Sequence, residues 1–205
     1  DFLVEEYGRR KQYDKAVNLA WRQFRQQPRL EYYKTLKVAA TANGSWPAQR
    51  EQVLDHLQRM DTGKKSSNHW GHNSGSILLI DIYLWEKNID SALRTADHSG
   101  ASASQWLTLA RACEPDRPAE AARIYRARLD GIVDIKNNRA YDEGADKVKT
   151  VRKLMDRIGQ QAQFNCWLEE VRALHKAKRN FMQKLEGIRP LQVTGPEEEE
   201  EEATR

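Results

Sequence analysis

A four-residue pattern recurs along this 205-residue chain: an apolar residue, two small or polar residues, and an alanine that opens an amphipathic helix. It occurs at 13–16, at 89–92 and, more loosely, at 118–121. Recurrence at roughly 34–40 residues is typical of stacked helical hairpins, because each hairpin buries its apolar face against the next one. The pattern therefore predicts an all-α fold. Arrays of this kind usually hold partners rather than transform substrates.

The composition agrees with a helical array that has a thin core. The chain has only 11 Gly and 6 Pro, and residues that favour helices, such as Leu, Lys, Arg, Ala, Glu and Gln, are abundant. Hydrophobic residues make up a modest 39% of the chain. A repeat array tolerates this value because each hairpin needs to bury only the faces that touch its neighbours.

The first complete hairpin carries the clearest helical periodicity. Apolar and small residues recur at a spacing of three or four, which places them on one helical face: Tyr13, Ala16, Val17, Ala20 and Phe24. Pro28 then ends the helix. This order of small, large and proline positions resembles a tetratricopeptide repeat. The resemblance implies a tetratricopeptide-like α-α superhelix, or solenoid, of about five helical hairpins.

The remaining hairpins are expected at 30–60, 77–99, 106–129 and 141–185. The almost continuous apolar run 77–85 is predicted to be a central buried helix, and the last helix is predicted to continue from Phe164 to Leu185 as a cap. A loop insertion is expected at 61–76. The expected organisation is a tetratricopeptide-like helical repeat domain over 1–186, followed by a disordered acidic tail over 187–205.

The net charge of +4 conceals a basic body and an acidic end. The run 197–202 supplies six glutamates, and without residues 197–205 the chain has 33 Lys and Arg against 24 Asp and Glu. A basic body attracts nucleic acid, an acidic partner or its own tail. A moderate excess of Lys and Arg is also common on ordinary helical proteins that bind no anion. The glutamate run can likewise be a tail that is simply solvated.

Compartment signals in the sequence are weak. Cys113 and Cys166 are isolated, which fits reduced thiols in a cytoplasmic protein better than a zinc site or a disulfide scaffold. No apolar run reaches the length of about 18 residues that a membrane span needs, so no membrane is expected. Because the chain begins at Asp1 without a signal-like segment, we expect a piece of a larger cytoplasmic protein.

Motifs that carry catalysis are absent from the sequence. The segment 63–66 lacks the spacing of a phosphate-binding loop, and His69 and His72 fall short of a zinc set. No nucleophile elbow, metalloprotease helix or dinucleotide fingerprint occurs. We therefore expect no enzyme activity, no cofactor and no metal.

Two surfaces are candidates for binding. Arg172, His175, Lys176 and Arg179 follow the spacing of one helical face on the expected last helix, and such a stripe either binds phosphates or is a solvated outer face. Helical arrays also present a concave surface from the first helix of each hairpin. Aromatic residues exposed there anchor peptides, and the candidate peptide-groove anchors are Tyr7, Tyr33 and Trp46.

Several strings in the chain resemble one bacterial family. They occupy 16–21, 84–86, 137–141 and 175–182. They are similar to the C-terminal helical-repeat region of SWIM zinc-finger proteins, and the similarity spans roughly residues 1–187. In that family a Cys-x-Cys and Cys-x-His zinc pattern precedes the helical region. This chain has no such pattern, so no metal ligand carries over.

Together these features predict a non-catalytic protein–protein interaction scaffold, the C-terminal part of a larger SWIM zinc-finger-like protein. Its expected ligand is a protein or peptide segment in the concave groove. The alternative is an accessory nucleic-acid-binding module that acts through the basic stripe on the last helix.

Overall fold

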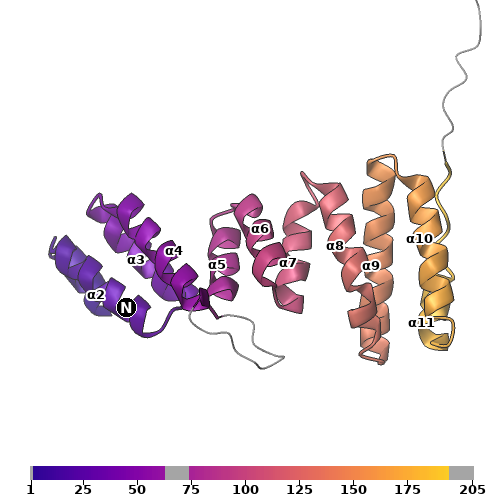
Figure 1. Cartoon of the computed structure of the whole chain (residues 1–205), viewed down its shortest axis with the longest axis horizontal. Coiled ribbons are helices and arrows are strands. Elements are labelled where there is room, and N and C mark those ends of the chain that lie inside the picture. Colours follow the sequence, from indigo (N-terminus) through magenta and orange to yellow (C-terminus); the bar gives the residue numbers. More distant parts are fainter. Residues whose placement is uncertain (1, 63–73, 194–205) are drawn as a thin grey trace, which may run out of the picture. The chain divides into compact units, whose positions relative to one another are not determined.

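The computed structural model describes residues 2–62 and 74–193, and over these residues the backbone forms eleven α-helices and no strand (Figure 1). The chain divides into two compact units, residues 1–109 and 110–205. The helices follow one another along the chain as α1 (Phe2–Arg9), α2 (Tyr13–Gln26), α3 (Leu30–Ala42), α4 (Trp46–Thr62), α5 (Ser74–Trp85), α6 (Ile89–Ser99), α7 (Ala103–Cys113), α8 (Pro118–Val133), α9 (Asn138–Arg157), α10 (Gln161–Leu174) and α11 (Arg179–Leu185).

One turn geometry closes four of the helix pairs, namely α1–α2, α3–α4, α5–α6 and α9–α10. Each turn has a residue with φ between 57° and 70°: Lys11, Gly44, Lys87 and Gly159. The backbone N–H of that residue donates to the carbonyl three residues earlier, and the next N–H donates to the carbonyl five residues before it. These two hydrogen bonds cap the last turn of the first helix, and the turn places the second helix beside it.

In the first unit, α3 is the helix with the most neighbours, since it contacts α1, α2, α4 and α5. It therefore touches its own hairpin partner, α4, and also the first helices of the two adjacent hairpins. Its buried side is formed by Tyr33, Leu36 and Ala40, which are fully enclosed. The buried apolar helix predicted over 77–85 is confirmed as part of α5, where Ile80 and Ile82 are completely buried.

The second unit is organised around α9, which contacts α8, α10 and α11. Close packing at its first half requires a glycine. A Cβ on Gly144 would lie 2.9 Å from Cγ2 of Val133, which is closer than Cβ contacts in proteins allow, and 3.1 Å from the ring of Phe181, which is tighter than most. Glycine at this position lets α8 and α11 approach the same stretch of α9.

The predicted continuous last helix is wrong. The helix ends at Leu174, four non-helical residues follow, and α11 begins at Arg179. The described residues thus form eleven helices, one more than the ten of five hairpins. The buried His175 occupies the break, and its ring edge meets Phe181 at 5.4 Å between centroids.

The described helices group into two compact units, and the expected repeat domain over 1–186 stays a prediction. Two predicted boundaries need correction. Helices reach Thr62 and start again at Ser74, so only 63–73 of the expected insertion 61–76 lies outside the described residues. The start of the expected tail is anchored at two residues: Ile188 and Leu191 are buried, and Asn165 exchanges two hydrogen bonds with the backbone of Leu191 at 2.7 and 2.9 Å. The glutamate run lies outside the described residues.

None of the described helices combines the length and the apolar character needed to cross a membrane.

The shared turn makes a testable prediction about stability. Lys87 holds a left-handed backbone conformation that an L side chain disfavours, so Lys87→Gly should raise the free energy of unfolding by about 1 kcal/mol. Urea unfolding followed by circular dichroism measures the change. The matched control is Lys153→Gly in the interior of α9, which should lower stability by a similar amount. Destabilisation by Lys87→Gly would contradict the assigned turn.

Candidate functional site

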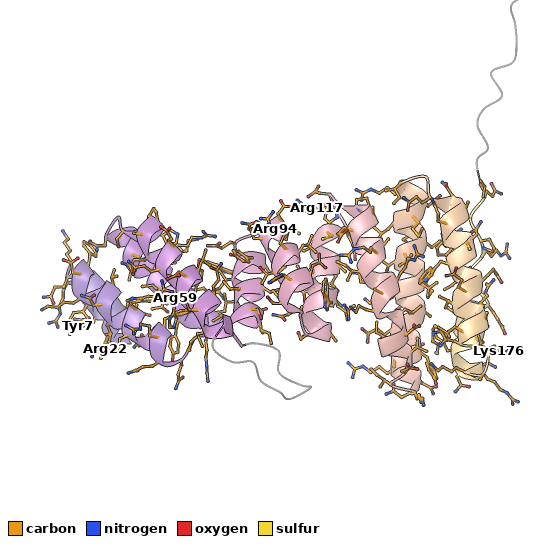
Figure 2. The ribbon with its side chains drawn as sticks, in the orientation of Figure 1. Tyr7, Arg22, Arg59, Arg94, Arg117 and Lys176 are labelled. Atoms are coloured by element: carbon orange, nitrogen blue, oxygen red, sulfur yellow. The ribbon has the colours of Figure 1, made fainter. Side chains whose placement is uncertain are left out.

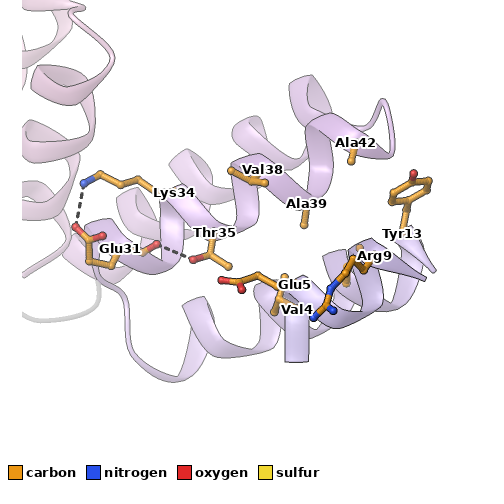
Figure 3. Close-up of a pocket in the computed structure, with 12 residues that line it drawn as sticks. Val4, Glu5, Arg9, Tyr13, Glu31, Lys34, Thr35, Val38, Ala39 and Ala42 are labelled. Carbon is orange, nitrogen blue, oxygen red and sulfur yellow. Dashed lines mark hydrogen bonds and ion pairs between the residues drawn. The ribbon is translucent and has the colours of Figure 1, made fainter. Parts of the chain in front are cut away.

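The first unit contains a cavity of about 490 Å³ between α1 and α3, with α2 at its base (Figure 3). α3 supplies half of its lining, and the other half comes from α1 and the start of α2. The lining residues are Val4, Glu5, Gly8, Arg9, Tyr13, Ala16, Glu31, Lys34, Thr35, Val38, Ala39 and Ala42. All of them belong to the first helix of a hairpin or to the start of α2.

Small residues keep this groove open. Ala16, Ala39 and Gly8 leave its base unfilled, and a Cβ on Gly8 would meet no atom within 4 Å. Val38 stands on α3 above this base and is 73% exposed. Figure 3 shows Val38, Ala39 and Ala42 following one another along α3, on the side that faces Val4 and Arg9 of α1. The result is an apolar recess that no side chain of the described residues fills.

The charged residues at the groove are balanced. Two acids and two bases line it, Glu5 and Glu31 against Arg9 and Lys34. The Lys34 Nζ donates to Glu31 Oε1 at 2.9 Å, and Arg9 pairs with Glu6 at 2.8 Å. These are exposed pairs on single helices, which contribute little to stability and are screened by salt. The groove therefore offers an apolar surface with a neutral rim, which suits an apolar side chain better than an ion.

A polar network holds the opposite side of α3. Tyr33 donates its hydroxyl to Glu86 Oε1 at 2.6 Å, and Arg50 donates to both oxygens of the same carboxylate, at 2.6 Å from Nη2 to Oε2. Glu86 lies just after α5 and its side chain is only 11% exposed, so the network joins α3, α4 and the end of α5 away from bulk water. Bidentate bonds from arginine to a carboxylate are among the stronger polar contacts in proteins.

The network shifts the ionisation of its members. Burial alone would raise the pKa of Glu86, but the hydrogen bonds from Arg50 and Tyr33 and the charges of Arg50 and Lys37 outweigh it, and the pKa falls below 4.5. Burial, and then the hydrogen bond to Glu86, raise the pKa of Tyr33. The carboxylate is therefore charged and the phenol neutral at ordinary pH.

Lysines cover the aromatic rings beside this network. The Lys37 Nζ lies 4.7 Å from the ring centroid of Trp85 and 5.6 Å from that of Trp46. The Lys34 Nζ lies 5.8 Å from the same Trp85 ring. The two tryptophans also meet Tyr33 edge-on, at centroid distances of 5.3 and 5.9 Å. These contacts fix the position of α3 against α4 and α5.

The predicted aromatic anchors do not line the groove. Tyr33 is fully buried and its hydroxyl is bonded to Glu86, so it is not available to a ligand, and that prediction is wrong. Trp46 is half-buried against Tyr33 under Lys37. Tyr7 is half-buried too, with the Lys15 Nζ 6.0 Å from its ring centroid. None of the three is among the residues that form the cavity.

The sequence contains a signal for one groove residue that was not among the predicted anchors. Val38 is an apolar residue out of phase with the buried set at 33, 36 and 40, since it falls on the opposite side of the same helix. Such a residue is a candidate contact for a partner. Its neighbours Ala39 and Ala42 are small, which the sequence shows, but the cavity itself depends on how far α1 stands from α3.

The basic stripe is not a single helical face in the structure. Arg172 lies on α10, His175 and Lys176 in the break, and Arg179 at the start of α11. Arg172 donates to Glu169 at 2.7 Å and to the Ile188 carbonyl at 2.9 Å. Lys176 and Arg179 are exposed, and Figure 2 shows Lys176 at the edge of the second unit. The stripe therefore reduces to two exposed cations.

His175 has a structural environment. Its side chain is 4% exposed, and Nε2 lies 2.9 Å from Asp130 Oδ1. The Lys178 Nζ lies 3.1 Å from Nδ1 and donates to Asp134 at 2.6 Å. Because an ammonium group only donates, Nδ1 accepts from Lys178, and the Nε2–H group donates a hydrogen bond to Asp130 Oδ1. The bond from Lys178 lowers the pKa of Asp134. These hydrogen bonds connect the residues between α10 and α11 to the C-terminal end of α8.

Within residues 2–62 and 74–193, no cluster of three His, Cys, Asp or Glu side chains is arranged to hold a metal ion. The segment 63–66 and both loop histidines, His69 and His72, lie outside the described residues.

Comparison with protein-family models gave no match, and no curated protein and no solved structure matches the chain significantly. The resemblance to SWIM zinc-finger proteins accordingly stays a prediction.

The Glu86 network predicts both a mutational cost and a pH dependence. Glu86→Gln should lower the free energy of unfolding by about 2 kcal/mol, because it removes charge-assisted bonds from Arg50. The pKa of Glu86 is depressed in the folded chain, so its stabilisation is present above about pH 4.5 and is lost as the pH falls further. Chemical unfolding from pH 3 to pH 7 should therefore show a gap between wild type and variant that closes in acid.

The matched control is Glu31→Gln, which breaks an exposed pair on α3 and should change stability by less than about 0.5 kcal/mol. An equal loss in both variants, or a gap between wild type and Glu86→Gln that does not narrow as the pH falls from 7 toward 3, would contradict a charged Glu86 that joins three elements.

Proposed function

We propose that this chain is a non-catalytic scaffold for protein–protein interaction, built as a tetratricopeptide-like array of helical hairpins. Two observations support the architecture. The same left-handed turn closes four helix pairs, and α3 contacts the first helices of both adjacent hairpins. Neighbour-to-neighbour packing of repeated hairpins is how solenoids are assembled. Arrays of this kind present their ligand surface on the first helices of the hairpins.

The groove between α1 and α3 carries the functional proposal. It is lined mainly by first helices, it is apolar, and its rim charges cancel. Its volume of about 490 Å³ falls in the range of sites that hold small ligands or side chains of a peptide. The partner is a peptide segment that lays an aliphatic or aromatic side chain into the recess against Val38 and Ala39.

The wider setting is part of the same proposal. The sequence resemblance supports a place in a larger bacterial protein of the SWIM zinc-finger type. The two cysteines are free, one buried and one exposed, which fits a reducing compartment such as the cytoplasm. Nucleic-acid binding through the last helix is the weaker candidate, because only Lys176 and Arg179 of the stripe are exposed.

A peptide library tests the groove. Phage-displayed random dodecapeptides selected on the wild-type chain should share an aliphatic or aromatic residue. Val38→Glu should weaken their binding by about tenfold or more, because a carboxylate then stands in the apolar recess. Fluorescence anisotropy with a selected, labelled peptide measures the affinity, and circular dichroism confirms that the variant is folded.

Ile135→Glu is the control, since Ile135 is also strongly exposed but lies in the turn after α8. It should leave peptide affinity unchanged. If no peptide is enriched, or if Val38→Glu binds as well as wild type, the groove is not the site. Binding of duplex DNA that is lost in Lys176→Glu with Arg179→Glu would support the nucleic-acid alternative instead.

A further inference from the structure

The outer face of α2 carries a second hollow, of about 610 Å³, whose character is polar. It is lined by Asn18, Trp21, Arg22, Arg25 and Gln26. These positions are separated by three or four residues or adjoin one another, so they form one face of the helix. The groove residues of α2, Tyr13 and Ala16, do not take part in this hollow.

Two guanidinium groups in this hollow have no ionic partner in the structure. Neither Arg22 nor Arg25 forms an ion pair with any residue of 2–62 or 74–193, although many other exposed arginines of the chain pair with a carboxylate one turn away. Figure 2 shows Arg22 projecting from α2 at the edge of the first unit. An arginine carries its charge at every physiological pH, so both remain open to an anion.

A fixed aromatic ring, that of Trp21, lines the same hollow. The Trp21 ring stacks on Phe24 at 5.7 Å between centroids with an angle of 11°, and it meets the His56 ring edge-on at 6.0 Å. Phe24 is completely buried, so the indole is held in place rather than free to rotate. Burial, and next the charge of Arg25, lower the pKa of His56. The imidazole is therefore neutral and adds no competing charge behind Trp21.

We propose that this α2 face binds a glutamate-rich peptide segment of a partner protein. Arg22 and Arg25 pair with two side-chain carboxylates, because the planar guanidinium matches a carboxylate in a two-bond geometry. Asn18 and Gln26 supply amide groups at the two ends of the hollow for the peptide backbone. The Trp21 ring packs against the methylene groups of the glutamate side chains.

The size and charge of the surroundings favour a short acidic peptide over a nucleic acid. From Asn18 to Gln26 the helix rises by about 12 Å, which matches about four residues of extended peptide. The basic face ends at an acid on its own helix, since Asp14 is exposed one turn before Asn18. A phosphate backbone needs a longer run of cations than two arginines.

The probe is fluorescein-labelled hexaglutamate, measured by anisotropy against the full chain whose own run at 197–202 is replaced by glutamine to prevent competition. Binding should be saturable. Arg22→Glu with Arg25→Glu should weaken it by about tenfold or more, and Arg22→Gln with Arg25→Gln by a smaller factor. The control pair Arg94→Glu with Arg139→Glu makes the same change in net charge at other exposed positions and should weaken binding by less than about twofold.

Several results would overturn the proposal. These are an absence of saturable binding, equal binding of labelled hexaglutamine, an equal loss in the control pair, or tighter binding of a single-stranded oligonucleotide with a steep salt dependence. Val38→Glu should leave hexaglutamate affinity unchanged. A failure at the α2 face therefore remains distinguishable from a failure at the α1–α3 groove.

Discussion

The left-handed turn between paired helices is the constraint on which the rest of this structure depends. A residue with positive φ and two backbone hydrogen bonds stops one helix and returns the chain alongside it. Glycine takes this conformation at 44 and 159, and lysine accepts its cost at 11 and 87. Because the turn is short and similar each time, the first helices α1, α3 and α5 of the first unit lie near one another. The contacts of α3 with both α1 and α5 follow from that spacing.

The two sides of α3 then take different roles. Tyr33 and its neighbours face the core and the Glu86 network, which binds α3 to α4 and α5 through short, partly buried bonds. Val38, Ala39 and Ala42 face α1, where small residues leave a recess. Rigid fixation on one side and an unfilled surface on the other are what a scaffold needs to hold a peptide without reorganising. The same division applies to α2, whose inner face builds the groove and whose outer face displays Arg22 and Arg25.

Sequence reasoning was strongest where apolar periodicity and helix breakers agree. The helix at 13–26 was predictable because its buried residues repeat at three or four and because Pro28 follows its end. The helix over 77–85 was predictable because an almost continuous apolar run fits a buried helix of the array. The break at 175–178 was not predictable. Its four residues contain no glycine or proline, so the sequence carries no signal that ends a helix there. The burial of Tyr33 was not predictable either, because a tyrosine fits a surface anchor and a core position equally well.

The central claim is that the α1–α3 groove is the surface that holds a peptide. Methyl-detected nuclear magnetic resonance, during titration with a peptide selected on the wild-type chain, tests this most directly. If a peptide binds there, shift changes should concentrate on the methyl groups of Val4, Ala16, Val38 and Ala39, which line the groove. The methyl groups of Ile135 and Leu174 in the second unit should stay unperturbed. Changes centred on the second unit, with the groove methyl groups unaffected, would contradict it.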